Sequence, residues 1–116
     1  MLRKEVYSLM ERVAFKLKLR PEKKIEYRKM HDEIWPEMLE TLEDAGIQNY
    51  TIWCSGDDLF GYYEVADSRH SNDVLAHSPV VARWNEAMSR IYYPDIDPET
   101  GTLRGMELMF KYNLTE

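Results

Sequence analysis

The sequence predicts an α+β domain in which a small antiparallel sheet carries helices. Two observations predict it: stretches whose apolar residues alternate with a period of two, and stretches whose apolar residues recur at helical spacing. The two kinds follow one another along 116 residues, with no internal repeat or linker-like stretch between them. We therefore expect a single domain at residues 11–116, preceded by a short N-terminal arm at residues 1–10.

The first strand of the domain is predicted from Glu11. Val13, Phe15, Leu17 and Leu19 alternate with small or charged residues, as expected of a strand with one buried face. Pro21, two residues later, ends this pairing.

A pair of helices follows. The apolar face of the first carries Tyr27, Met30, His31 and Ile34, at i, i+3, i+4 and i+7. Trp35 precedes a proline and is disfavoured in a helix, so we expect a second helix to begin at Pro36 and to end at Gly46.

A β-hairpin is predicted next, from two strand-like runs at Gln48–Cys54 and Leu59–Val65. Residues 55–58 between them read Ser-Gly-Asp-Asp, a typical turn composition. Tyr50 should share a strand face with Cys54, which we expect to be buried rather than reactive.

Two more helices and a last strand complete the pattern. Asp67 and Ser68 can cap a helix that runs to about His77, and Ser78-Pro79 begins another. The apolar stripe of the latter is Val80, Trp84, Met88 and Ile91. A long loop at Tyr93–Gly105, of a length that is often functional, leads to an alternating strand at Met106–Tyr112.

This order of elements is that of the ferredoxin-like, split βαβ arrangement. All helices of that fold cover one face of a four-stranded sheet. The third strand carries large apolar residues on both faces, so we expect a second copy of the chain to cover the open face, as a homodimer.

Composition excludes several functional classes. The formal net charge of −6 disfavours nucleic-acid binding, which depends on basic surfaces. No apolar run is long enough to span a membrane, and no secretion signal is recognisable. The single cysteine cannot form an internal disulfide and indicates a cytoplasmic protein.

One residue stands out as a candidate acid–base group. His31 lies on the apolar face of its helix, one turn after Tyr27, and imidazole titrates near neutral pH. The alternative is a core histidine whose ring is satisfied by a backbone carbonyl. Tyr50 and Trp84 combine apolar faces with hydrogen-bonding groups, as sugar sites do, although core packing is the more frequent use of each of them taken singly.

The run from Tyr27 to Glu37, of the form YxxxHxxIWPE, closely resembles the L-rhamnose mutarotase family. Three further segments agree with that family: RVAFKLKLRPE before the run, GIQNYTIW after it and ARWNEAM in the late helix. The resemblance runs from about Arg12 to the C-terminus.

This resemblance implies a dimeric α+β barrel that interconverts the α and β anomers of L-rhamnose, with neither a metal nor a cofactor. It also implies that His31 is the proton donor and that Tyr27, Tyr50 and Trp84 bind the sugar. Family members often have two adjacent tryptophans in the late helix, where this chain has Trp84-Asn85. We therefore add Asn85 to the expected binding residues, and expect Trp35 to be structural.

Three alternatives stay open at this stage. One is a mutarotase for another 6-deoxyhexose, because Asn85 replaces an aromatic ring. The second is a small monooxygenase of the same dimeric barrel class, although the YxxxHxxIWPE run disfavours it. The third is a sugar-binding module without turnover.

Overall fold

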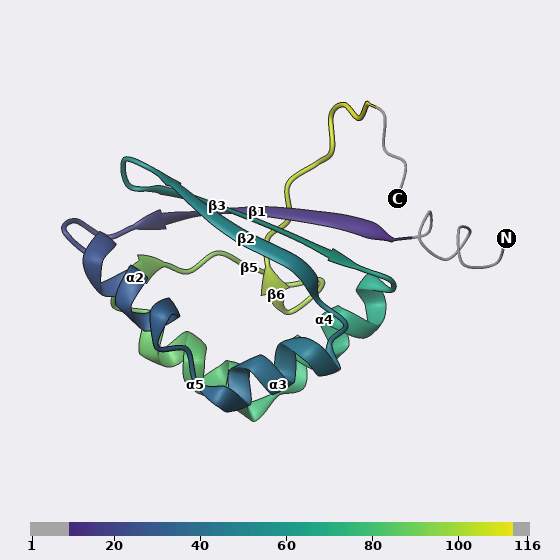
Figure 1. Cartoon of the computed structure of the whole chain (residues 1–116), viewed down its shortest axis with the longest axis horizontal. Coiled ribbons are helices and arrows are strands. Elements are labelled where there is room, and N and C mark those ends of the chain that lie inside the picture. Colours follow the sequence, from purple (N-terminus) through teal and green to yellow (C-terminus); the bar gives the residue numbers. More distant parts are fainter. Residues whose placement is uncertain (1–9, 113–116) are drawn as a thin grey trace, which may run out of the picture.

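The computed structural model describes residues 10–112, and its centre is a four-stranded antiparallel sheet (Figure 1). The strand order is β2-β3-β1-β4. The strands are β1 at Glu11–Leu19, β2 at Gln48–Ser55, β3 at Asp58–Val65 and β4 at Tyr92–Tyr93. This antiparallel sheet with helices confirms the predicted α+β, ferredoxin-like fold class. The predicted N-terminal arm lies outside the described residues, except for Met10.

The long central strands β1 and β3 are paired along almost their whole length, from Glu11 opposite Val65 to Lys18 opposite Asp58. The predicted hairpin of β2 and β3 is present, and Gly56 adopts a positive φ of 62° in its turn. Glycine suits this position because it lacks the Cβ atom that disfavours positive φ in other residues.

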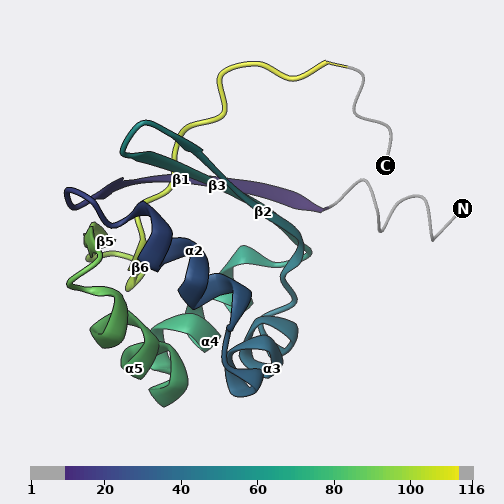
Figure 2. The same cartoon turned by 60° about the vertical axis from the view of Figure 1, so that its left-hand side comes forward.

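Four helices cover one face of the sheet: α2 at Lys24–Asp32, α3 at Pro36–Asp44, α4 at Ser68–His77 and α5 at Pro79–Met88 (Figures 1 and 2). Both α3 and α5 begin with a proline, as predicted. A proline is tolerated there because the first N–H groups of a helix have no partner within the helix. None of the helices in the described part of the chain could cross a membrane.

The hydrophobic core lies between the sheet and these helices. On the sheet it is formed by alternate residues of β1 and β3, such as Leu19 and Leu59, and on α5 by Met88. Phe15 packs directly against Gly61 on the neighbouring strand, where a Cβ atom would collide with the phenyl ring. At this point of the sheet the large side chain is therefore on β1 and none is on β3. The space above the Phe15 ring stays open for side chains from the helices.

The predicted long loop after Tyr93 contains a small hairpin, with β5 at Ile96–Asp97 and β6 at Thr102–Leu103. The hairpin packs on α4, where the Thr102 hydroxyl donates to Asn72 Oδ1 at 3.2 Å. It therefore forms a fixed side wall for the space between sheet and helices.

The predicted last strand at Met106–Tyr112 is wrong. Gly105 forms a single bridge with Phe15, and the Met106 N–H donates to the carbonyl oxygen of Ala14 at 2.7 Å. The chain then continues on the side of the sheet opposite the helices, without strand pairing to residues 10–112 (Figures 1 and 2). Alternation predicts an extended backbone, but a strand also needs a partner edge along its length.

Cys54 is exposed, so its predicted burial is also wrong. It does lie on the same strand face as Tyr50, but it sits next to the β2–β3 turn, where the helices no longer cover the sheet. Its Sγ donates a hydrogen bond to the carbonyl oxygen of Gly56 at 3.2 Å.

Removing the N-terminal cap of α4 should destabilise the fold. The Asp67 carboxylate accepts hydrogen bonds from the N–H groups of Arg69 and His70, at 3.0 and 3.3 Å. Asp67→Ala is expected to lower the free energy of unfolding by about 1 kcal/mol, measured by urea denaturation. The control Asp73→Ala, on the same helix, removes an exposed pair with His77 and should change the free energy of unfolding by less than about 0.5 kcal/mol. Equal effects of the two variants would contradict this role of Asp67.

Candidate active site

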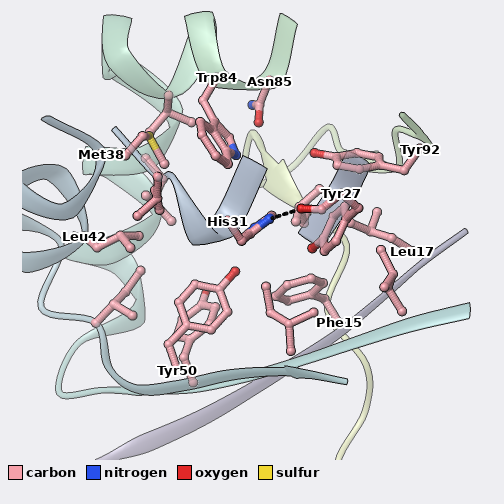
Figure 3. Close-up of a pocket in the computed structure, with 18 of the residues that line it drawn as sticks. Phe15, Leu17, Tyr27, His31, Met38, Leu42, Tyr50, Trp84, Asn85 and Tyr92 are labelled. Carbon is pink, nitrogen blue, oxygen red and sulfur yellow. Dashed lines mark hydrogen bonds between the residues drawn. The ribbon is translucent and has the colours of Figure 1, made fainter. Parts of the chain in front are cut away.

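A pocket of about 850 Å³ lies between the helix-covered face of the sheet and the helices (Figure 3). Its walls are mostly apolar, with a few polar groups, as is typical of small-molecule sites. All five residues singled out in the sequence line it, namely Tyr27, His31, Tyr50, Trp84 and Asn85. They come from α2, β2 and α5, so the fold brings together residues that are up to 58 positions apart in the chain, from Tyr27 to Asn85.

The position of His31 is set by the helix that carries it. Its Nδ1 lies 3.1 Å from the backbone carbonyl oxygen of Tyr27, one turn earlier in α2. A carbonyl oxygen only accepts hydrogen bonds, so Nδ1 carries the proton and Nε2 keeps its lone pair when the ring is neutral. The hydrogen bond to a backbone carbonyl that is expected of a core histidine is thus present. It leaves the second ring nitrogen, Nε2, available to the pocket.

Aromatic rings hold His31 on two sides. The Tyr27 ring lies 4.4 Å from the imidazole, tilted by 30°, and the Trp84 indole meets it edge-on at 5.4 Å. Trp35 packs edge-on against Trp84 at 5.1 Å, which supports its predicted structural role. These contacts restrict the imidazole to one orientation.

Burial lowers the pKa of His31 below its ordinary value of 6.5. The hydrogen bond to the Tyr27 carbonyl and the nearby Asp32 carboxylate both oppose this change, and the loss of hydration outweighs them. At neutral pH the side chain is therefore an uncharged base.

Tyr50 reaches the pocket from β2, next to an irregularity in the strand. The register of β2 against β3 shifts between Gln48 and Thr51, and Asn49 adopts a positive φ of 52°. The Asn49 amide donates to Glu64 Oε1 at 2.7 Å and holds the irregular backbone in place. Such bulges re-aim neighbouring side chains and are common beside active sites.

The tyrosine hydroxyl groups of the pocket are hydrogen-bond donors over the whole physiological pH range. Burial raises the pKa of both Tyr27 and Tyr50 well above the ordinary value of 10. Within residues 10–112 neither hydroxyl has a hydrogen-bond partner. Unpaired, protonated hydroxyl groups in a partly apolar cavity suit a neutral ligand that carries hydroxyl groups of its own.

Trp84 and Asn85 are adjacent on α5 but differ in burial. Trp84 is buried against His31, whereas Asn85 is exposed at the mouth of the pocket. In Figure 3 the Asn85 amide lies beyond the Trp84 indole, toward Tyr92. Asn85 can therefore contact only the part of a ligand that is nearest to solvent.

Sequence reasoning missed two tyrosines of the pocket, Tyr63 on β3 and Tyr92 on β4. Tyr63 is on the predicted hairpin, and its alternation with Phe60 and Tyr62 could have placed it on the inner face. Tyr92 offered no such signal, because its position depends on pairing with Leu19, 73 residues away in the chain.

No group of three or more histidine, cysteine, aspartate or glutamate side chains is arranged to hold a metal ion within residues 10–112. The charged residues at the pocket's rim, such as Arg28 and Asp32, form an exposed ion pair at 3.7 Å. The lining also includes aromatic residues that offer hydroxyl, indole and imidazole edges to the pocket.

Comparison with known proteins identifies the family of this arrangement. A family model described as L-rhamnose mutarotase matches residues 12–112, nearly the whole described chain. The chain belongs to the L-rhamnose mutarotase family. This membership favours the mutarotase interpretation over the monooxygenase interpretation of the same α+β class.

Individual members show the extent of the similarity. The L-rhamnose mutarotase of Jannaschia sp. is 43% identical over 95 residues, covering 78% of this chain and 89% of the relative. That of Acidiphilium cryptum is 39% identical, covering 82% and 94%. The crystal structure of L-rhamnose mutarotase from Formosa agariphila superimposes with a TM-score of 0.71 at 29% identity, covering 89% of this chain and 99% of that one.

The lowered pKa of His31 can be measured directly. An NMR pH titration should give the imidazole a midpoint below 6.5, with His31→Asn used to assign its signal. Because the folded pKa is the lower one, the unfolded chain takes up this proton first as the pH falls. The neutral ring therefore contributes stability above pH 6.5, and this contribution declines as the pH falls through that value. A midpoint at or above 6.5 would contradict the burial described here.

Proposed function

We propose that this chain interconverts the α and β anomers of L-rhamnose, with His31 as the acid–base group. Membership of the mutarotase family makes it an enzyme of the isomerase class. One observation carries the mechanism: the Nδ1 hydrogen bond to the Tyr27 carbonyl leaves Nε2 of a neutral imidazole open to the pocket, where the Tyr27 and Tyr50 hydroxyl groups have no hydrogen-bond partner among residues 10–112.

The reaction needs one proton to leave the anomeric hydroxyl group and one to reach the ring oxygen. Neutral His31 accepts the proton from the anomeric hydroxyl at Nε2, a carbonyl forms at C1, and the C1–O5 bond breaks. The imidazolium then donates its proton to O5, which agrees with the proton-donor role implied by the family resemblance. Rotation about C1–C2 and the reverse transfers close the ring on the other face.

The remaining residues orient the sugar during these transfers. Tyr27 and Tyr50 offer hydroxyl donors, and protonated hydroxyl groups can also relay protons. Trp84 offers a flat apolar face for the ring carbons or the 6-methyl group, while Asn85 offers an amide at the pocket mouth. A neutral sugar needs no opposing charge, which fits a pocket whose walls are mostly apolar and aromatic.

A mutarotase for another 6-deoxyhexose is the second candidate, and Asn85 is the observation that favours it. An amide exchanges stacking area for hydrogen-bonding capacity at the outer end of the ligand. Rates of catalysed anomer exchange across a panel of aldoses decide between L-rhamnose and another 6-deoxyhexose as the substrate. A maximum for L-rhamnose supports the first proposal, and a maximum for another 6-deoxyhexose supports the second.

We propose further that the enzyme is a cytoplasmic homodimer built on the open face of the sheet. Trp53 and Phe60 form a cross-strand pair on this face, and the Trp53 side chain is 69% exposed. Beyond Gly105, Met109 and Phe110 are 83% and 79% exposed. Large apolar side chains exposed on the open side of a sheet mark protein contacts. Pairing of residues 106–112 with a second copy of the chain would cover both the Trp53–Phe60 pair and the exposed side chains of this segment.

Removal of the imidazole should abolish catalysis. His31→Ala is expected to reduce the catalysed rate of anomer exchange by about 10²- to 10⁴-fold, measured by saturation-transfer NMR on L-rhamnose. His77→Ala is the control, because His77 is exposed and, among the residues that the structure describes, bonds only to Asp73 on its own helix. A His31→Ala protein with unchanged melting temperature and wild-type rate would contradict the proposal. Ligand binding without any acceleration by the wild type would instead support the sugar-binding module.

The homodimer should be visible in the molecular mass. Sedimentation equilibrium at micromolar concentration is expected to give twice the chain mass of 13.8 kDa. Phe110→Asp places a charge in the proposed contact and should shift the population toward single chains, whereas Glu107→Asp, a conservative change in the same segment, should not. A wild-type mass of one chain would refute the dimer.

A further inference from the structure

Tyr92 is a buried residue of the pocket to which neither the sequence motif nor the mechanism above gives a role. It lies in β4, opposite Leu19 of β1, and its side chain is 5% exposed. The backbone on either side is fixed, because the Arg20 N–H donates to the carbonyl oxygen of Ile91 at 2.9 Å. Strand pairing therefore determines where this phenol points.

The Tyr92 hydroxyl points into the pocket from the side opposite Tyr50. Figure 3 shows it on the side of the cavity where Trp84 and Asn85 lie, while the Tyr50 hydroxyl rises from the other side. The sheet order explains this, since β2 and β4 are the two edge strands and β3 and β1 lie between them. The two tyrosines thus bracket the space beside His31.

This hydroxyl group has no hydrogen-bond partner among residues 10–112. Its nearest aromatic neighbour is Tyr27, whose ring lies edge-on at 6.3 Å, and Tyr27 in turn stacks on His31 at 4.4 Å. Burial raises the pKa of Tyr92 to about 12, so the group remains a donor at neutral pH. Buried polar groups are nearly always paired, and a phenol open only to a cavity finds its partner in what fills the cavity.

The next residue, Tyr93, is a tyrosine on the same edge strand that does not enter the pocket. Tyr93 points to the other face by strand alternation, is 46% exposed, and packs under the Arg20 guanidinium at 4.4 Å. Tyr92 and Tyr93 therefore lie on the same strand, but Tyr92 is buried in the pocket and Tyr93 is exposed on the other face.

We infer that Tyr92 is a further substrate-contacting residue, whose hydroxyl donates to a sugar hydroxyl at the opposite end of the ring from the one bound by Tyr50. The inference rests on the proposed function, because it takes an aldopyranose as the ligand. A donor there selects sugars that carry a hydroxyl group at this end of the ring. Tyr92 is thereby a specificity-determining residue, separate from the acid–base step.

The test replaces only the hydroxyl group. Tyr92→Phe is expected to lower kcat/KM for L-rhamnose by about 3- to 10-fold, the range of one neutral hydrogen bond, with the melting temperature unchanged. Tyr93→Phe is the matched control and should leave kcat/KM at the wild-type value. Exchange NMR gives both values.

Deoxy analogues distinguish a hydrogen bond from a packing effect. Among the 2-, 3- and 4-deoxy forms of L-rhamnose, one should be processed equally by wild type and Tyr92→Phe, because it lacks the bonded hydroxyl group. The other two should keep the 3- to 10-fold difference. The inference would be overturned if Tyr92→Phe lowered kcat/KM no more than Tyr93→Phe does. It would also be overturned if Tyr92→Phe lowered kcat/KM equally with all three analogues.

Sugar binding separates this inference from the proposed function. If the wild type accelerates no anomer exchange, the proposed function is wrong, and titration calorimetry with L-rhamnose still decides the role of Tyr92. A 3- to 10-fold weaker Kd for Tyr92→Phe alone supports the contact. An unchanged Kd, or no binding by the wild type, overturns it.

Discussion

The hydrogen bond between His31 Nδ1 and the Tyr27 carbonyl is the constraint on which the candidate site depends. It uses a helical spacing of four residues to fix both the tautomer and the direction of the imidazole. The rings of Tyr27 and Trp84 then prevent the imidazole from turning. Without this bond, either nitrogen could carry the proton, and the neutral ring would not present one defined base to the pocket. The proposed acid–base chemistry thus begins from a local property of α2.

The sheet supplies what a single helix cannot, namely hydroxyl donors that enter the pocket from separate directions. Tyr50 and Tyr92 come from the two edge strands, and Phe15 and Tyr63 of the central strands form the floor between them. The small hairpin of β5 and β6 closes the side of the pocket against α4. Burial keeps the tyrosine hydroxyl groups protonated and lowers the pKa of His31, so the same desolvation prepares both the donors and the base.

The sequence predicted those features that depend on local spacing. The stripe of α2 placed Tyr27 and His31 together, the prolines marked the starts of α3 and α5, and the turn after Cys54 located the hairpin. Features that depend on distant pairing were not predictable. Met106–Tyr112 has the alternation of a strand, but the only bridge is at the preceding Gly105 and the described residues of this segment pair with no strand of residues 10–112. Cys54 shares a face with Tyr50 but lies beyond the helices, and Tyr92 enters the pocket because β4 pairs with β1.

The tautomer of His31 is the most direct test of this account. In protein labelled with ¹⁵N, the two imidazole nitrogens of His31 give separate NMR signals, and each signal reports whether its nitrogen carries a proton. At neutral pH the account predicts a protonated Nδ1 and an unprotonated Nε2, with the Nε2 signal shifting on addition of L-rhamnose. A protonated Nε2 in the free enzyme, or an Nε2 signal that L-rhamnose leaves unchanged, would contradict it.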